Sequence, residues 1–298
     1  MMKQAIIDIG SNSMRLTVYD TDGDSFKILF REKVMAGLAG YVEKRVLSAE
    51  GITCACNGLL DFKETLASLG IGNVAVFATA SLRNIDNTEE AVAVIKAATG
   101  YAVEVISGEK EALYGYTGAM RDFRLDNGAF LDIGGASTEI ALFAEGRPFH
   151  SVSFQIGSLN LYRKCVKKII PGGGALKKIR GTIEREIDEK RLFDFSKQVP
   201  LVCVGGTSRA VLKIAQRLYD LPENCHTVTA AQLRTIADIL CRGDKEAVDL
   251  ILKLATDRVH TIIPGVMILQ HIFDLFDAEE IIVSKYGVRE GYLCQKVL

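Results

Sequence analysis

One short pattern occurs twice in this chain, at residues 6–19 and again at residues 130–143. Each copy has a β-branched apolar run, an Asp-x-Gly turn with a hydroxyl, and a second run of alternating apolar residues. This order predicts a strand–turn–strand hairpin, with glycine where the backbone needs conformational freedom. Two such hairpins so far apart in the chain predict two similar domains that hold a ligand between their hairpin tips.

Length and composition agree with two domains. A chain of 298 residues is long for a single core. An apolar content of 48% with 24% charged residues is typical of a globular protein. The strand-rich opening and the β/α alternation occur twice, which predicts an α/β fold with mixed sheets. We expect the domains to span residues 1–124 and 125–298.

Several function classes are disfavoured. A net charge of −1 creates no global field that would attract nucleic acid or membrane. The seven cysteines include no CxxC pair and the four histidines form no ligand-like pair, which argues against zinc and for thiols in a reducing compartment. The chain enters a strand too early for a signal peptide, and the apolar stretch 262–269 is too short to cross a bilayer. We therefore expect a cytoplasmic protein.

Apolar spacing and turn signals predict the secondary structure along the chain. We expect a sheet from residue 4 to residue 35, a polar loop over 79–87 and helical segments from the third strand of the second copy up to residue 195. The other expected helices are 48–69, 88–98, 109–120, the segment after Thr207, 229–241, 245–254 and 265–276, and the other expected strands are 74–78, 103–106, 129–133, 138–143, 149–155, 202–204 and 280–284.

The hairpins end in residues that suit phosphate or metal. Equivalent positions of the two copies are Asp8 and Asp132, Gly10 and Gly134, and Ser13 and Ser137. A carboxylate at the end of an apolar strand is costly unless it binds something. Because Mg²⁺ takes one or two carboxylates together with phosphate oxygens, Asp132 and Asp8 are candidate metal ligands. The alternative is that each aspartate only accepts hydrogen bonds from its own turn.

Three glycine–hydroxyl turns follow strands. Backbone N–H groups at such turns form concave anion sites that serine hydroxyls reinforce, although hairpins also use these residues for geometry alone. The candidate phosphate-binding residues of the three turns are Gly10, Ser11, Asn12 and Ser13; Gly134, Gly135 and Ser137; and Gly205, Gly206 and Thr207.

Separated motifs along nearly the whole chain carry a family resemblance. They are Asp8–Arg15, Ala78–Arg83 with Asn87, Ser107–Ala112, Asp132–Glu139, Gly205–Thr207 and Val283–Gly291. In their order and content the chain resembles the exopolyphosphatase/guanosine pentaphosphate phosphohydrolase (Ppx/GppA) phosphatase family, part of the actin–hexokinase–Hsp70-like superfamily. The resemblance implies two ribonuclease H-like (actin-like ATPase) domains with mixed sheets flanked by helices, an active-site cleft between them, and a last helix that packs back on the first domain.

The resemblance also implies residue roles. It makes Glu111 the general base, which would take a proton from water, and Glu139 a second acidic residue that holds metal or orients water. Glu111 could instead be a plain glutamate in a first helical turn. Arg15 stands where the second copy has Glu139. Arg15, Arg83 and Arg289 are candidate phosphate ligands, and Arg83 or Arg289 could instead form a surface ion pair.

Two departures from the family pattern stand beside the site. Ala136 replaces a glycine of the second turn, so the turn must use ordinary dihedral angles or carry strain. Lys110 places a cation beside Glu111, which could weaken the base or attract phosphate. Both departures put turnover and substrate preference in question.

One segment is concentrated in positive charge. Residues 163–180 contain seven basic and no acidic residues: Arg163, Lys164, Lys167, Lys168, Lys177, Lys178 and Arg180. Such a segment could guide a long polyanion, or it could be a solvated helix face. The lack of interleaved aromatic residues beyond Tyr162 disfavours nucleic acid.

The resemblance implies a Mg²⁺-dependent hydrolase that removes the terminal phosphate of inorganic polyphosphate as orthophosphate. One alternative is guanosine pentaphosphate 5′-phosphohydrolase activity by the same residues. Another is a non-catalytic sensor that binds nucleotide or alarmone. The partners implied are polyphosphate or guanosine pentaphosphate, without nucleic acid or membrane, and family members often form homodimers.

Overall fold

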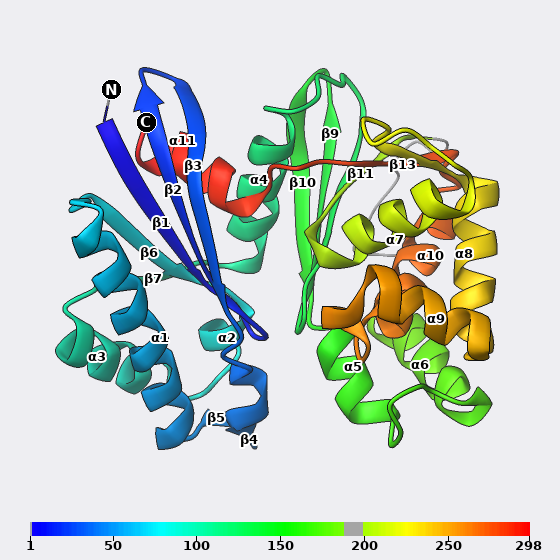
Figure 1. The fold of residues 1–298 in the computed structure, drawn as a ribbon, viewed down its shortest axis with the longest axis horizontal. Helices are drawn as coiled ribbons and strands as arrows, with labels where there is room; N and C mark the ends of the chain where they lie inside the picture. The colour runs from blue at the N-terminus through cyan, green and yellow to red at the C-terminus, as the bar shows by residue number, and fades with distance from the viewer. Residues whose placement is uncertain (1, 188–198) are drawn as a thin grey trace. The chain divides into compact units, whose positions relative to one another are not determined.

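A computed structural model describes residues 2–187 and 199–298 (Figure 1). The expected helical region up to residue 195 therefore lies partly outside the described residues. The chain divides into two compact units, Met1–Glu111 with Tyr292–Leu298, and Ala112–Gly291. Each unit contains a mixed β-sheet with helices, so the expected α/β fold is confirmed.

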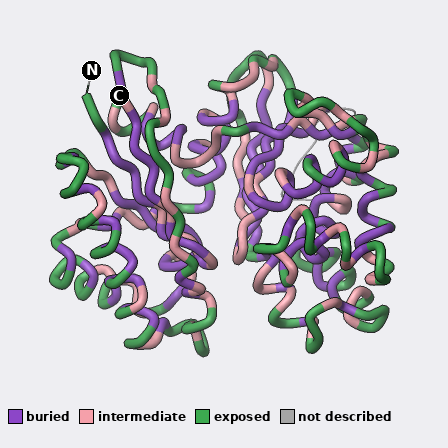
Figure 2. Tube along the Cα trace, viewed as in Figure 1, coloured by how far each residue is buried: buried purple, intermediate pink, exposed green. Residues whose placement is uncertain are grey.

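The first unit is built on a five-stranded sheet of order β3-β2-β1-β6-β7. The first three strands form an antiparallel meander, and β1 continues into parallel pairing with β6, which pairs in parallel with β7. Ile6 and Ile7 are both fully buried although they point to opposite faces, so β1 is covered on both sides (Figure 2). The strands are β1 (Met2–Ile9), β2 (Met14–Asp22), β3 (Ser25–Val34), β6 (Val74–Ala78) and β7 (Val103–Val105), and the short β4 (Val42–Glu43) and β5 (Val46–Leu47) form a separate pair that follows the 3₁₀ helix η1 (Leu38–Tyr41).

Local signals set the helices of the first unit. Helix α1 (Ala49–Ser68) begins where the hydroxyl of Ser48 accepts the Gly51 N–H, and α3 (Thr88–Thr99) ends at Gly100, whose φ is +81°. The expected polar loop over 79–87 is wrong in part, because it contains the short helix α2 (Ala80–Arg83). The backbone N–H groups of Leu82 and Arg83 both donate to the Thr79 carbonyl, which closes this turn.

The second unit repeats the sheet order and extends it. Its order is β10-β9-β8-β11-β13-β12, with β8, β11 and β13 parallel, β9 and β10 antiparallel on one side, and β12 antiparallel at the other edge. The strands are β8 (Gly128–Ile133), β9 (Thr138–Ala144), β10 (Arg147–Phe154), β11 (Leu201–Val204), β12 (Thr227–Thr229) and β13 (Glu280–Val283).

Helices cover one face of this second sheet. The hydrophobic core on that face contains Leu131, Ile133 and Cys203 from the sheet, and it includes the largely buried helix α10 (Ile262–Leu275). Helix α10 packs against four of the other helices of the unit. The remaining helices are α5 (Ser158–Cys165), α6 (Gly173–Glu186), α7 (Gly205–Leu218), α8 (Ala230–Arg242), α9 (Lys245–Leu254) and the 3₁₀ helix η3 (Thr256–Arg258).

Helix α4 (Gly108–Ala119) explains where the first unit ends. Its Ala112, Tyr116 and Ala119 are buried with Phe130 and Phe143 of the second sheet. This packing assigns most of α4 to the second unit, so the compact units divide at 111/112, and the domain bounds expected at 124/125 stay a prediction. Sequence spacing identified the helix but could not show which sheet its apolar face would cover.

The C-terminal helix α11 (Val288–Lys296) ends in the first unit. The ring of Tyr292 stacks on Phe77 with 4.8 Å between centroids, and its hydroxyl donates to Glu104 Oε2 at 2.8 Å. Lys296 Nζ also lies 3.8 Å from Glu104 Oε1. These contacts account for the assignment of residues 292–298 to the same unit as β6 and β7. No helix in the described ranges is long and apolar enough to cross a membrane.

Close packing at Gly291 gives a first testable prediction. A Cβ added to Gly291 would overlap the backbone of Tyr114, whereas one added to Gly181 of α6 would meet nothing. Gly291→Ala is expected to lower the free energy of unfolding by about 1–3 kcal/mol. Gly181→Ala is expected to raise it by about 0.5–1 kcal/mol, because glycine in a helix carries an entropic cost. Urea unfolding of both variants checks this, and equal stabilities would contradict the packing.

Candidate functional site

The first hairpin has the predicted geometry. Strand β1 turns into β2 through residues 10–13, and the Gly10 N–H donates to the Ser13 carbonyl at 3.2 Å. A Cβ on Gly10 would lie 2.9 Å from that carbonyl oxygen, so the turn requires glycine. One pair away from the last strand pair before the turn, Asp8 lies opposite Arg15 in the strand register. The first hairpin therefore pairs a carboxylate with a guanidinium on one face.

The second hairpin has the same turn and different charges. The Gly134 N–H donates to the Ser137 carbonyl at 2.9 Å. At the register position equivalent to the first pair, Asp132 lies opposite Glu139. Glu139 is buried, and its Oε1 accepts the hydroxyl of Ser153 at 2.8 Å. Two carboxylates at opposed register positions are of the type that a cation binds, and the metal role of this pair stays a prediction.

The start of helix α5 packs against the second turn and forms hydrogen bonds with it. A Cβ on Gly157 would lie 2.5 Å from backbone atoms of Gly135 and Ala136. The Ser158 N–H donates to the Gly134 carbonyl at 3.0 Å, and the Asn160 amide donates to the Ala136 carbonyl at 2.9 Å. In the described chain Ala136 is not among the non-glycine residues with positive φ, so the turn uses ordinary dihedral angles at this position.

The third turn joins β11 to α7 and lies beside Asp132. Gly205 opens the helix with a φ of +87°, and a Cβ there would lie 2.5 Å from Asp132 Oδ1. Thr207 is buried, and its side chain packs against Gly265 of α10. Since the first N–H groups of a helix carry partial positive charge, the start of α7 complements the Asp132 carboxylate.

Arg83 and Glu111 form a buried ion pair in the first unit. Arg83 Nη1 lies 2.6 Å from Glu111 Oε2 and also donates to the Ile106 carbonyl at 3.2 Å. Their side chains are 16% and 10% exposed, so Arg83 does form an ion pair, but a part-buried one and not one at the surface. Removal of one partner from a buried pair strands a charge and costs about 3–5 kcal/mol of stability.

In each unit, the candidate residues lie at the edge of the sheet where its parallel strands end. In the first unit the hydroxyl of Ser81 donates to the Ile9 carbonyl, and the Ile106 N–H donates to the Ala78 carbonyl at 3.0 Å. The first turn, α2 and the start of α4 therefore follow the carboxyl ends of β1, β6 and β7, where open α/β sheets bind ligands. In the second unit the two glycine turns follow β8 and β11 in the same way.

Arg289 follows the third parallel strand of the second unit. It is half-buried in the first turn of α11, and a Cβ added to the nearby Gly287 would lie 3.5 Å from Val204, the residue before the third turn. The carboxylate of the neighbouring Glu290 accepts the Gly287 N–H at 2.9 Å and so stabilises the start of α11.

The predicted metal ligands are divided between the two units. No group of three or more histidine, cysteine or acidic side chains suited to a metal occurs in the described ranges. Of the predicted ligands, Asp132 and Glu139 come together within one unit, and Asp8 belongs to the other. Two hard carboxylates fit Mg²⁺, which completes its coordination with water and phosphate oxygens.

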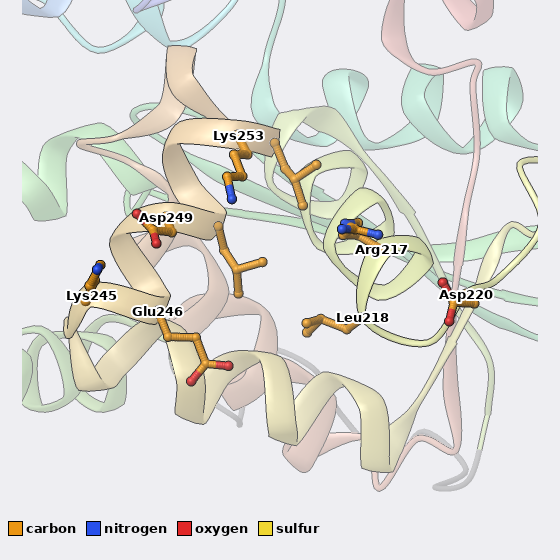
Figure 3. Close-up of a pocket in the computed structure, with 9 residues that line it drawn as sticks. Arg217, Leu218, Asp220, Lys245, Glu246, Asp249 and Lys253 are labelled. Carbon is orange, nitrogen blue, oxygen red and sulfur yellow. The ribbon is translucent and has the colours of Figure 1, made fainter.

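Two surface pockets lie away from the glycine turns. One, of about 600 Å³, is lined by Arg217, Asp220, Lys245 and Asp249 among others, at the end of α7 opposite to Gly205 (Figure 3). The other, of about 610 Å³, includes Val74 and Val103 at the amino ends of β6 and β7. Neither pocket therefore contains the candidate residues.

The comparisons with known proteins agree with this geometry. The Ppx/GppA phosphatase family matches residues 17–298. The chain belongs to this family. Membership makes it an enzyme of the phosphoanhydride hydrolase class. The Ppx/GppA family member of Aquifex aeolicus has a similar structure with a TM-score of 0.80 and 25% identity, covering 99% of this chain and 97% of its own.

Two relatives carry different activity names. Exopolyphosphatase 1 of Mycobacterium tuberculosis is 23% identical and matches over 99% of this chain and 88% of its own length. A guanosine-5'-triphosphate,3'-diphosphate pyrophosphatase of Pseudoalteromonas translucida is 27% identical and matches over 97% of this chain and 58% of its own length. The Ppx/GppA family therefore includes relatives named for both candidate substrates.

Arg258 is a further candidate phosphate ligand of this Ppx/GppA chain, and the sequence motifs did not indicate it. A Cβ on Gly206 would overlap the Arg258 guanidinium, so this cation packs directly against the third turn. Burial lowers the pKa of Arg258, and Asp257, whose Oδ2 lies 3.9 Å from it, opposes that shift. Arginine remains protonated in proteins. The sequence signal was indirect, because Gly206 leaves room for a partner that spacing could not identify.

The basic side chains of residues 163–180 are exposed. All seven lie on α5, on α6 or in the loop that joins them. Helix α5 starts at the second glycine turn through the bonds of Ser158 and Asn160. Helix α5 therefore links the second turn to the basic segment within one unit, with Arg163 and Lys164 in its last turn. Lys164 Nζ lies 3.9 Å from Glu186 Oε1.

Proposed function

We propose that this Ppx/GppA phosphatase hydrolyses the terminal phosphoanhydride bond of inorganic polyphosphate and releases orthophosphate. The observation that favours polyphosphate is the exposed basic surface of α5, α6 and the loop between them, because α5 itself starts at the second glycine turn. A linear polyanion can use charges along such a surface, whereas guanosine pentaphosphate has phosphates only at its two ribose positions. The exopolyphosphatase name of a relative supports the same substrate.

The reaction proposed is direct attack by water. Glu111 takes a proton from the water as its oxygen bonds to the terminal phosphorus, and the bond from phosphorus to the bridging oxygen breaks. Orthophosphate and a polyphosphate shortened by one unit leave. Backbone N–H groups of the three glycine turns, with Arg15, Arg83, Arg258 and Arg289, stabilise the charge on the phosphoryl oxygens.

Mg²⁺ is the proposed cofactor, with Asp132 and Glu139 as the residues that would hold it and Asp8 as a further candidate. When bound, the ion would neutralise charge on phosphate oxygens. The opposed pair of carboxylates in the second hairpin supports this assignment. The Ser153 hydroxyl on Glu139 helps to orient one of the two ligands.

A phosphate-release assay tests the proposed function. Long-chain polyphosphate, tripolyphosphate and guanosine pentaphosphate are compared at equal concentrations of terminal phosphate. The expected result is the highest kcat/KM for long-chain polyphosphate. A preference for guanosine pentaphosphate would transfer the proposal to that substrate, and nucleotide binding without phosphate release would indicate a sensor.

The basic surface makes a separate prediction. Replacing Lys167, Lys168, Lys177 and Lys178 together by Gln is expected to raise KM for long-chain polyphosphate about tenfold and to leave tripolyphosphate unaffected, because only a long chain reaches these exposed charges. Steady-state kinetics at several salt concentrations measure the effect. The control is Lys245→Gln with Lys253→Gln, which removes two exposed lysines that line the pocket of Figure 3. An equal rise in KM for both substrates would contradict the prediction.

A further inference from the structure

Two residues with separate proposed roles are bonded to each other. Arg83 is a candidate phosphate ligand and Glu111 the candidate base, yet Arg83 Nη1 lies 2.6 Å from Glu111 Oε2. We propose that the terminal phosphate of the substrate competes with Glu111 for Arg83, and that this exchange releases the Glu111 carboxylate to accept a proton from water. The inference rests on the proposed function and adds a coupling between substrate binding and activation of the base.

The surroundings make the exchange feasible. The Glu111 backbone is held in the first turn of α4, where its N–H donates to the Ser107 carbonyl at 2.9 Å. The Arg83 backbone is held by its N–H bond to the Thr79 carbonyl at 3.0 Å. Both residues have fixed main chains and long side chains, so partner exchange requires side-chain rotation, which for Arg83 also disturbs its bond to the Ile106 carbonyl.

Charge and burial favour phosphate over Glu111 as the partner of Arg83. The pair is mostly buried, with side chains 16% and 10% exposed, so little water screens it. A carboxylate that accepts an arginine N–H is stabilised in its ionised form and accepts a proton less readily. A phosphate group carries more negative charge than a carboxylate and binds a guanidinium in bidentate fashion. The base is therefore weak before substrate binds and becomes competent once phosphate engages Arg83.

A binding cycle tests the exchange without relying on turnover. Wild type, Glu111→Gln, Arg83→Gln and the double variant are titrated calorimetrically with a non-hydrolysable imido analogue of tripolyphosphate. If Glu111 competes for Arg83, Glu111→Gln is expected to tighten binding about fivefold in the presence of Arg83 and to change it little when Arg83 is absent. Glu109→Gln is the matched control, because Glu109 is an exposed glutamate in the same helical turn.

The outcomes separate the exchange from simple repulsion. A gain that persists in the Arg83→Gln background would mean that Glu111 only repels the anion, and would overturn the proposal. No gain over Glu109→Gln would also overturn it. Arg83→Lys, which keeps the charge but not the bidentate fork, is expected to give an intermediate gain and serves if Arg83→Gln does not fold. If wild type binds the analogue but releases no phosphate from polyphosphate, the proposed function is refuted. The binding cycle would still be interpretable in that case.

Discussion

Replacing Glu111 by Gln is expected to lower phosphate release from polyphosphate by a factor of about 10²–10⁴, the usual contribution of a positioned general base. Glutamine keeps the shape of the side chain but cannot take a proton from water. Substrate binding should be at least as tight as in wild type, so the loss appears in kcat. Single-turnover release of orthophosphate at saturating enzyme measures the chemical step directly.

The control for Glu111 is its neighbour Glu109. Both residues lie in the first turn of α4, but Glu111 is buried against Arg83 and Glu109 is exposed. Glu109→Gln is therefore expected to retain wild-type turnover. Thermal unfolding of both variants separates lost chemistry from lost stability, since a buried ion pair is broken in one of them. Normal turnover of a folded Glu111→Gln variant would refute its assignment as the base.

Replacing Asp132 by Asn is expected to lower turnover by about 10³-fold at a Mg²⁺ concentration that saturates wild type, because several kcal/mol of charge stabilisation is lost with the metal. Asn is nearly isosteric, which matters because the Asp132 carboxylate packs against Gly205. The measurement is phosphate release across a Mg²⁺ titration. The midpoint should move to higher Mg²⁺ in the variant, and chelation by EDTA should abolish activity in wild type.

The matched control is Asp126→Asn, an exposed aspartate of the same unit that precedes β8. It should keep both the turnover and the Mg²⁺ midpoint of wild type. Turnover that survives EDTA would contradict a metal requirement. An unchanged midpoint in Asp132→Asn would remove this residue from the metal site while leaving the requirement itself intact.

The sequence was sufficient for the features that short-range chemistry controls. The Asp-x-Gly pattern predicted both hairpins, and the structure places Gly10 and Gly134 in equivalent turns. It also predicted side chains of opposite charge on the two hairpins, since Arg15 and Glu139 occupy the same register position. Turn geometry and strand register follow from residues within a few positions of each other, so a linear pattern contains them.

Other features depended on contacts between residues far apart in the chain. The ion pair of Arg83 with Glu111 and the packing of Arg258 on Gly206 join separate elements, and no spacing rule relates them. The same is true of α4, whose apolar side chains cover the second sheet and move the boundary of the first unit to residue 111. A helical pattern shows that one face is buried but not against what.

The doubled hairpin thus determined the two-unit α/β architecture and the residue types at each turn, because hydrophobic alternation and glycine turns act locally. Only the tertiary structure decided which charges neutralise each other. Because burial makes an unpaired charge costly, the roles of Arg83 and Glu111 depend on each other, although the two residues belong to separate sequence motifs.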